Sequence, residues 1–106
     1  MNLSEPHFTN VKKKIKNVEI RLYDEKRKNL KKDDYIIFIK RENNSKTFKR
    51  RIKDIRIFYS FEKAIKHAKL KNCLPGIKTY KEGINLYYSF PNYKNLEKNG
   101  VIAIYF

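Results

Sequence analysis

The sequence is poor in the residues on which most metal and catalytic sites depend. Its 106 residues include one cysteine, two histidines, three glycines, three prolines and no tryptophan. A single cysteine, Cys73, excludes an internal disulfide and every multi-cysteine zinc site, which favours a reducing, cytoplasmic compartment. The histidines His7 and His67 each stand alone, without a second ligand at metal-binding spacing. We therefore expect no metal and no cofactor, and most enzyme classes are excluded.

Long apolar runs and acidic residues are also scarce. No stretch approaches the ~20 apolar residues that a membrane-spanning helix needs, and the N-terminus does not have the profile of a signal peptide, so we expect no membrane partner. Acidic residues number 11 against 26 lysines and arginines, giving a formal net charge of +15 at pH 7. Such a charge attracts polyanions, and RNA is the leading candidate. The alternative is a solvated basic surface without a specific partner.

The remaining composition is that of a folded chain. Hydrophobic residues make up 41% and aromatic residues 14% of the sequence, which is enough for a packed interior. A chain of this length has room for one hydrophobic core. We expect a single domain spanning residues 1–106, and we favour a monomer.

Residues 16–23 combine an apolar alternation with charged groups. Because successive side chains of a strand point to opposite faces, alternate residues share a face. The apolar positions are Val18, Ile20 and Leu22, and the polar positions are Glu19, Arg21 and Tyr23. Lys16 lies where the chain enters this strand. The pattern predicts one face packed on the core and one polar face that could floor a binding groove.

The order of short motifs around this strand resembles the ASCH domain, a branch of the PUA-like superfamily. Two motifs carry the resemblance, K-x-x-E-x-R on the first strand and D-x-I-x-F on the second. The matching residues are Lys16, Glu19, Arg21, Asp34, Ile36 and Phe38. Lys14 and Asp33 stand where the family usually has glycine. The later segments 74–76 and 100–104 are also similar to that family, so the resemblance spans nearly the whole chain.

The resemblance implies a fold and two kinds of function. The fold is an α+β, PUA-like domain, with a curved mixed sheet of five or six strands closing toward a β-barrel and two or three packed helices. PUA-like domains mostly bind RNA. One similar bacterial branch is an amidohydrolase acting on N4-acetylcytidine, and some ASCH members are described as ribonucleases. Lys16 matches the lysine of the amidohydrolase, Glu19 stands at its threonine, and Glu62 and Glu82 are both candidates for its glutamate.

The strands after residue 34 can be read from their apolar residues. The nearly continuous apolar run 35–39 predicts a central strand covered on both faces. The inward phase slips by one position between Ile52 and Ile55, which predicts a bulge near 53–54 in a curved sheet. The closing segment 101–106 predicts a strand paired inside the sheet.

Three helices are predicted from caps and apolar spacing. Ser4 is placed to cap a first helix whose apolar stripe contains Phe8, Val11 and Ile15. Ser60 is placed to cap a second helix, and Thr79 opens a third with a T-x-x-E capping box.

The polar trio of Lys16, Glu19 and Arg21 admits three interpretations. It can be structural, because Glu19 and Arg21 can pair on one strand face. It can bind a nucleotide, since Arg21 can grip a phosphate or base edge and Glu19 can accept hydrogen bonds from an exocyclic amine. It can catalyse, with Lys16 as nucleophile or base and Glu19 moving protons.

We predict the second function, binding of single-stranded or structured RNA, or of a modified nucleotide within it, in a basic cleft. The expected partner is RNA or a nucleotide or nucleoside. Tyr23, and one of Tyr80, Tyr87 and Tyr88, would stack an unpaired base. The predicted binding residues are Lys16, Glu19, Arg21, Tyr23, Lys26, Arg27 and Lys28. The hydrolytic alternative would use Lys16 and Glu19 as catalytic residues. A protein-interaction module, the third class, would instead show a contiguous exposed apolar patch.

Overall fold

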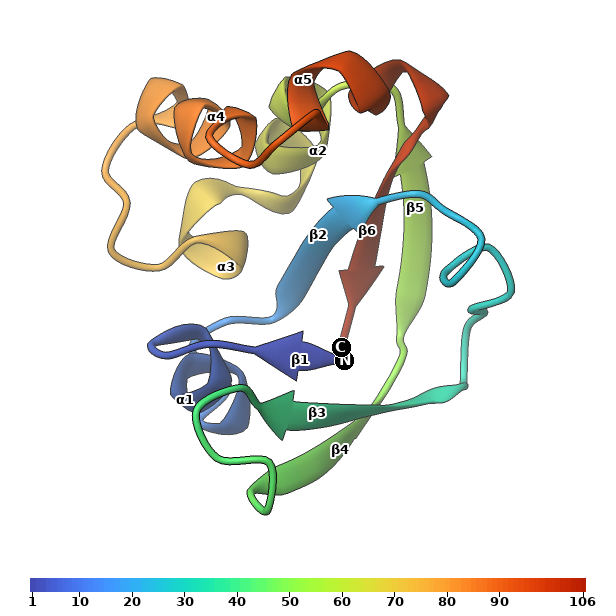
Figure 1. Cartoon of the computed structure of the whole chain (residues 1–106), viewed down its shortest axis with the longest axis vertical. Coiled ribbons are helices and arrows are strands. Elements are labelled where there is room, and N and C mark those ends of the chain that lie inside the picture. The colour runs from blue at the N-terminus through green and yellow to red at the C-terminus, as the bar shows by residue number, and fades with distance from the viewer.

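The computed structural model describes all 106 residues as an α+β fold with six strands and five α-helices (Figure 1). The strands form two three-stranded sheets, in the orders β1-β3-β4 and β2-β6-β5. The strands are β1 (Asn2–Leu3), β2 (Val18–Leu22), β3 (Tyr35–Lys40), β4 (Thr47–Arg51), β5 (Asp54–Phe58) and β6 (Val101–Tyr105). The helices are α1 (His7–Lys12), α2 (Phe61–Ala68), α3 (Leu70–Cys73), α4 (Tyr80–Tyr88) and α5 (Tyr93–Leu96), followed by a 3-10 turn over Glu97–Asn99.

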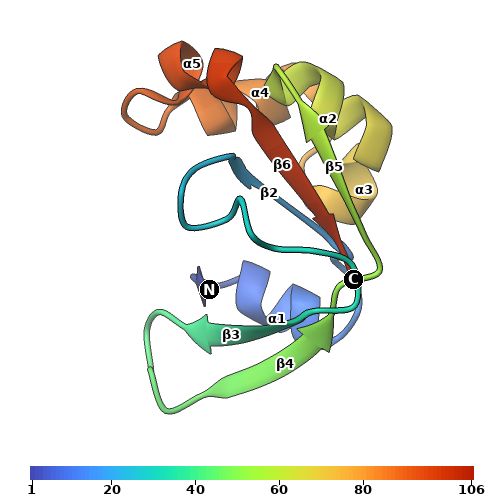
Figure 2. The same cartoon turned by 90° about the vertical axis from the view of Figure 1, so that its right-hand side faces the viewer.

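The α+β class is confirmed, but the prediction of one curved sheet closing toward a barrel is wrong. The strands lie in two separate sheets, and no closed barrel forms (Figure 2). The phase slip near residue 53 is not a bulge within one strand. The chain leaves one sheet at Arg51 and enters the other at Asp54, while the buried side chain of Ile52 fills the corner. A bulge and a change of sheet both shift the inward-facing positions by one residue, so the sequence pattern does not distinguish them.

Strand β6 is the centre of its sheet, as predicted, and it separates two hydrophobic cores. It pairs antiparallel with β2 on one side and with β5 on the other. Val101 and Ala103 belong to the helix-side core, with α2 and α4, whereas Ile102 and Ile104 belong to the lower core, with α1 and β3. Both faces of this strand are therefore covered.

Strand β3 is central in its own sheet, but only one of its faces is covered. Ile36 and Phe38 are buried in the lower core, as their alternation requires. Tyr35 and Ile37 point to the other side and are 61% and 57% exposed. The expectation of a strand buried on both faces is therefore wrong, because no helix packs over the outer face.

Two of the three predicted caps are confirmed. The Ser60 hydroxyl accepts a hydrogen bond from the Lys63 amide at 3.2 Å, and the Thr79 hydroxyl accepts one from the Glu82 amide at 3.1 Å. Ser4 does not cap α1, which begins at His7. Phe8 and Val11 are buried as predicted, but Ile15 is exposed because α1 ends at Lys12. None of the helices has the length and apolar character needed to cross a membrane.

Cys73 lies in the helix-side core and is fully buried, and burial raises the pKa of its thiol to about 11. Because the thiolate is the reactive form, we expect the folded protein to resist alkylation by iodoacetamide at neutral pH. Mass spectrometry should find one modified cysteine after urea unfolding and none before. Rapid modification under native conditions would contradict this burial.

Candidate functional site

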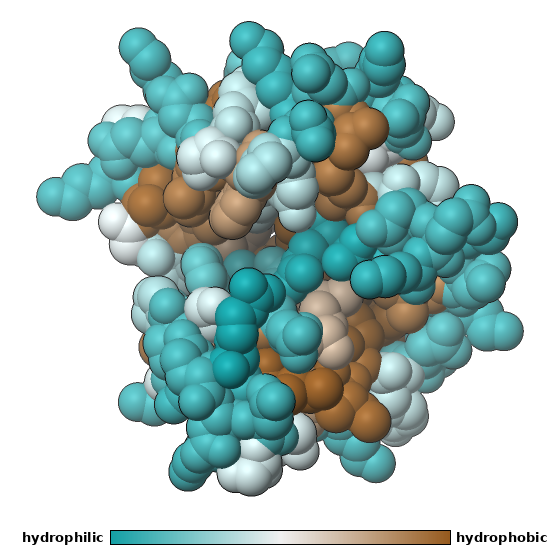
Figure 3. All heavy atoms as spheres, in the orientation of Figure 1, coloured by the Kyte–Doolittle hydropathy of each residue, from teal (hydrophilic) through white to brown (hydrophobic).

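A cavity of about 300 Å³ opens beside β2. Because β2 is an edge strand of its sheet, one side of its backbone faces this space instead of another strand. The segment 2–7 lines one side of the cavity, and α4 with the segment that follows it lines the other. Figure 3 shows the hollow across this face of the molecule, with hydrophilic residues inside it.

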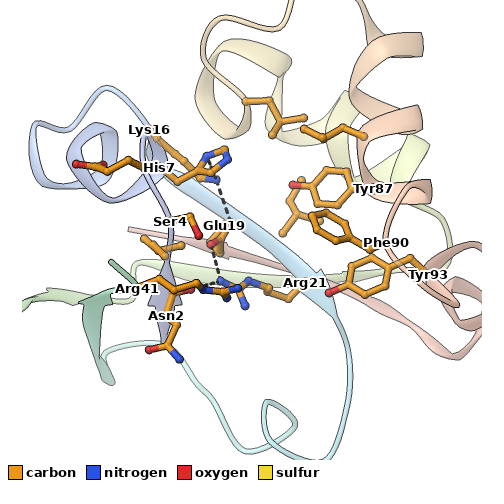
Figure 4. A pocket seen from close by; sticks show the side chains of 15 residues that line it. Asn2, Ser4, His7, Lys16, Glu19, Arg21, Arg41, Tyr87, Phe90 and Tyr93 are labelled. Carbon is orange, nitrogen blue, oxygen red and sulfur yellow. Dashed lines mark hydrogen bonds and ion pairs between the residues drawn. The ribbon is translucent and has the colours of Figure 1, made fainter. Parts of the chain in front are cut away.

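The predicted trio forms the polar floor of this cavity (Figure 4). The Lys16 ammonium lies 3.0 Å from one carboxylate oxygen of Glu19, and the Arg21 guanidinium lies 3.1 Å from the other. Lys16 is only 2% exposed and Glu19 only 4%. Arg21 also donates a hydrogen bond to the carbonyl of Asn2 at 2.9 Å. The floor is therefore an ion triplet with two cations and one anion, in which Lys16 and Glu19 are buried and Arg21 is partly exposed.

The charge state of Glu19 follows from its neighbours. Burial alone would raise the pKa of its carboxyl group, but Lys16 and Arg21 outweigh burial by charge and hydrogen bonding and hold this pKa at about 2. Glu19 is thus a carboxylate at every physiological pH. Each carboxylate oxygen of Glu19 is paired with one cation and can still accept a hydrogen bond from a further donor.

His7 joins this floor, although its isolation in the sequence did not point to it. Its Nδ1 lies 3.5 Å from the Lys16 ammonium, which can only donate, so the ring nitrogen accepts. Burial, and then the charge of Lys16, lower the pKa of the imidazole. His7 is therefore neutral at pH 7, and the net charge of the floor stays positive.

Aromatic residues form the opposite wall. Tyr87, Phe90 and Tyr93 line the cavity from α4, the turn after it and α5. Phe61 of α2 supports this wall from behind, with its ring stacked on Tyr87 at 4.6 Å and on Tyr93 at 5.7 Å between centroids. Phe90 is 46% exposed and packs on Tyr93 at 5.1 Å.

Glu97 anchors this wall to α2. One of its carboxylate oxygens accepts a hydrogen bond from the Tyr88 hydroxyl at 2.8 Å, and the other accepts one from the Phe61 amide at 3.0 Å. The second hydrogen bond gives a partner to a backbone N–H in the first turn of α2, which has none within the helix. One acidic side chain thus fixes α4 and α2 together behind the aromatic wall.

The hydroxyl of Tyr87 is free to meet a ligand. The residue is 6% exposed, and burial raises the pKa of its phenol well above the usual value, so the group keeps its proton. Its hydroxyl has no hydrogen bond within the protein, and every side-chain oxygen that is sealed from solvent has one. The hydroxyl therefore opens into the cavity, and Figure 4 shows it directed toward the polar floor.

A second cavity of about 390 Å³ adjoins the first and is strongly basic. The two share Asn2, Arg21 and Arg41. The second is lined by four basic side chains and no acidic one, namely Arg21, Lys26, Arg27 and Arg41. Lys26 and Arg41 are exposed and form no ion pair, whereas Arg27 is paired with Asp24.

The structure brings together five of the seven predicted binding residues. Lys16, Glu19 and Arg21 line the first cavity, and Arg21, Lys26 and Arg27 line the second. Lys28 lies in neither cavity and pairs with Glu25 at 2.9 Å. Tyr23 is also outside both, because the chain has left β2 and its ring packs beside Gly100.

The other tyrosine and glutamate candidates are also placed. Of the four tyrosines considered for base stacking, Tyr23, Tyr80, Tyr87 and Tyr88, only Tyr87 lines the cavity. Glu62 and Glu82 lie outside both cavities, and the acid that lines the first one beside Glu19 is Glu5.

Sequence reasoning missed Arg41 and the wall residues Phe90 and Tyr93. Arg41 carries no local signal, because it lies in a charged turn after β3. The aromatic residues follow Lys16 by more than 70 positions, so only the tertiary fold unites them with the floor. The T-x-x-E capping box did locate α4, and hence the helix that presents Tyr87.

Comparison with known proteins gives a family match over the full length. The family model described as "ASCH domain" matches residues 1–106. The crystal structure of hypothetical protein PH0355 is similar, with 35% identity, a TM-score of 0.84, and coverage of 99% of this chain and 93% of that one. The solution NMR structure of protein PF0455 from Pyrococcus furiosus is 37% identical, with a TM-score of 0.74 and coverage of 99% and 91%. No curated protein matches the chain.

Proposed function

Because the chain belongs to the ASCH domain family, we propose that it binds single-stranded RNA, with one base in the first cavity and the neighbouring phosphates in the second. The motif resemblance to PUA-like domains implies RNA binding in general terms. The contacts within the two cavities support the specific mode.

The first cavity suits a nucleobase in size and chemistry. Its volume of about 300 Å³ is at the lower end of the range of roughly 300–1,000 Å³ that small-molecule sites occupy. An aromatic wall with an exposed Phe90 can stack a base, and stacking contributes about 1–3 kcal/mol per base. Glu19 can accept from an exocyclic amine, and the Tyr87 hydroxyl can donate to a ring nitrogen or carbonyl. These groups favour a base that carries an amine beside an acceptor, such as cytosine.

The second cavity suits the sugar-phosphate backbone. Four basic side chains without an acidic one attract anionic oxygens, and Arg guanidinium groups bind phosphate with two parallel hydrogen bonds. Lys26 and Arg41 have no acidic partner to lose, so a phosphate would not compete with an existing ion pair.

The observation that carries the proposal is the contact between these cavities at Arg21 and Arg41. A base site that shares cationic lining residues with a basic site matches the order of groups in a nucleotide. A purely structural ion pair would need neither the open Tyr87 hydroxyl nor the unpaired cations beside it.

We expect fluorescein-labelled hexacytidylate to bind with an affinity that falls steeply with salt, at a log-log slope of about -0.7 for each contacted phosphate. The double variant Lys26→Ala/Arg41→Ala should weaken binding and make the slope shallower by about 1.4, because two contacts are lost. Fluorescence anisotropy across a salt series measures both. The control Lys63→Ala/Lys81→Ala removes the same charge from exposed sites on α2 and α4 outside both cavities, and should leave the slope nearly unchanged.

Three results would count against RNA binding in this cleft. A flat salt response would show that phosphates are not contacted, and equal losses in both double variants would reduce the interaction to general charge attraction. Release of cytidine from N4-acetylcytidine would favour the hydrolytic alternative, which the nucleoside-sized first cavity supports. We propose binding instead, because the Lys16 ammonium is engaged by Glu19 and His7.

A further inference from the structure

We infer that the bound RNA strand continues from the second cavity onto the exposed outer face of β3 and β4, where Tyr35 stacks the next base. This inference rests on the proposed function and extends it, because it makes a polynucleotide the ligand and not a single nucleoside.

The outer face of this sheet carries apolar side chains on β3 and cationic side chains on β4. The strand register places Tyr35 opposite Arg51, and Ile37 opposite Lys49. All four side chains are exposed, and Tyr35 and Ile37 are among the most exposed large hydrophobic residues of the chain. In Figure 3, a hydrophobic area lies over the lower part of the same face that bears the hollow.

The chemistry of this face fits RNA better than a protein surface. The Lys49 ammonium lies 5.1 Å from the centroid of the Tyr35 ring, so an aromatic ring and a cation are already adjacent. Lys49 forms no ion pair, and the single acid paired on this face is Asp33, at 2.7 Å from Arg51. Single-strand binding sites combine aromatic platforms with a positive groove in this way. An acidic protein partner would satisfy the cations but leave the open Tyr35 ring without a specific contact.

Tyr35 also connects this face to the cleft. It lines the second cavity together with Lys26, Arg27 and Arg21. A strand whose phosphates lie on these cations therefore lies next to Tyr35. The order along the ligand would be a base in the first cavity, phosphates in the second, and a stacked base on Tyr35.

The test compares cytidine 5′-monophosphate with hexacytidylate by titration calorimetry. Tyr35→Ala should weaken hexacytidylate by about 5- to 150-fold, the equivalent of one stacked base, and weaken the mononucleotide much less, because a mononucleotide has no second base to stack on this ring. Tyr35→Phe keeps the ring and should bind as the wild type does. Tyr59→Ala, which removes another highly exposed tyrosine outside both cavities, is the matched control and should change neither affinity.

The outcomes separate this inference from the proposed function. If the wild type binds hexacytidylate and Tyr35→Ala binds it equally well, the path over β3 is wrong while the cleft proposal stands. If Tyr35→Ala weakens the mononucleotide as much as the hexamer, Tyr35 acts on the cleft and the path is again wrong. If neither ligand binds the wild type, the proposed function fails and this inference fails with it. Loss of self-association in Tyr35→Ala without any change in RNA affinity would assign the face to a second copy of the chain instead.

Discussion

Replacing Glu19 by glutamine should lower the free energy of unfolding by about 3–5 kcal/mol, because it leaves the buried Lys16 ammonium and the partly buried Arg21 guanidinium without their shared anion. Lys16 is only 2% exposed, and its remaining partner, His7, is neutral. A domain of this size has a total stability of about 5–15 kcal/mol, so the loss is a large share of it. Urea unfolding followed by circular dichroism measures the change.

The ion triplet of Lys16, Glu19 and Arg21 also predicts a pH dependence of stability. The folded-state pKa of Glu19 is about 2, below the unfolded value of 4.5, so folding favours its carboxylate. That stabilisation, about 3 kcal/mol from the shift in pKa, is fully present above pH 4.5 and disappears as the pH falls toward 2. The difference between wild-type and Glu19→Gln stabilities should therefore shrink in this window, and subtraction cancels other carboxylates such as Glu5.

Glu25→Gln is the matched control for Glu19→Gln. Its ion pair with Lys28 is exposed, and exposed pairs contribute about 0–1 kcal/mol. We expect little change in its stability and no change in its pH profile. A loss in Glu19→Gln no larger than in Glu25→Gln would show that the trio is solvated in solution, and the buried floor would then be wrong.

Replacing Phe61 by alanine should cost about 3–5 kcal/mol of stability and also impair RNA binding. Phe61 is fully buried in the helix-side core, and its ring stacks on Tyr87 and Tyr93. Its loss leaves a cavity behind the aromatic wall, so both tyrosines can move away from the polar floor. Urea unfolding measures the first effect and hexacytidylate anisotropy the second.

Phe38→Ala separates the two effects. Phe38 is equally buried, but it lies in the lower core and packs on Phe48 and Phe106, away from the wall. We expect a similar loss of stability, with hexacytidylate affinity retained under conditions where both variants are folded. Equal affinities in the two variants would mean that the aromatic wall does not contact the base.

The polar floor was predictable because it depends on local periodicity. A strand alternates faces whatever it packs against, so Glu19 and Arg21 had to point away from Val18 and Ile20. The caps at Ser60 and Thr79 are equally local, since each hydroxyl bonds an amide three residues later. These features required no knowledge of the rest of the fold.

The features that were mispredicted depend on contacts between distant segments. The apolar run of β3 does not reveal that nothing covers Tyr35 and Ile37, because coverage is a property of neighbouring elements. The slip at Ile52 is equally compatible with a bulge and with a change of sheet. The aromatic wall requires α4 and α5 to pack on α2. The apolar periodicity of α4 and α5 does not reveal which element they pack against.

Strand β6 also determines how the site meets its ligand. Its two faces supply both cores, so the helix-side half and the lower half cannot separate without exposing one of them to water. We therefore expect the cleft between these halves to be preorganised. We expect RNA to enter a rigid receptor whose walls are already at their final spacing, so that association is limited by ordering the flexible strand and not by any rearrangement of the protein.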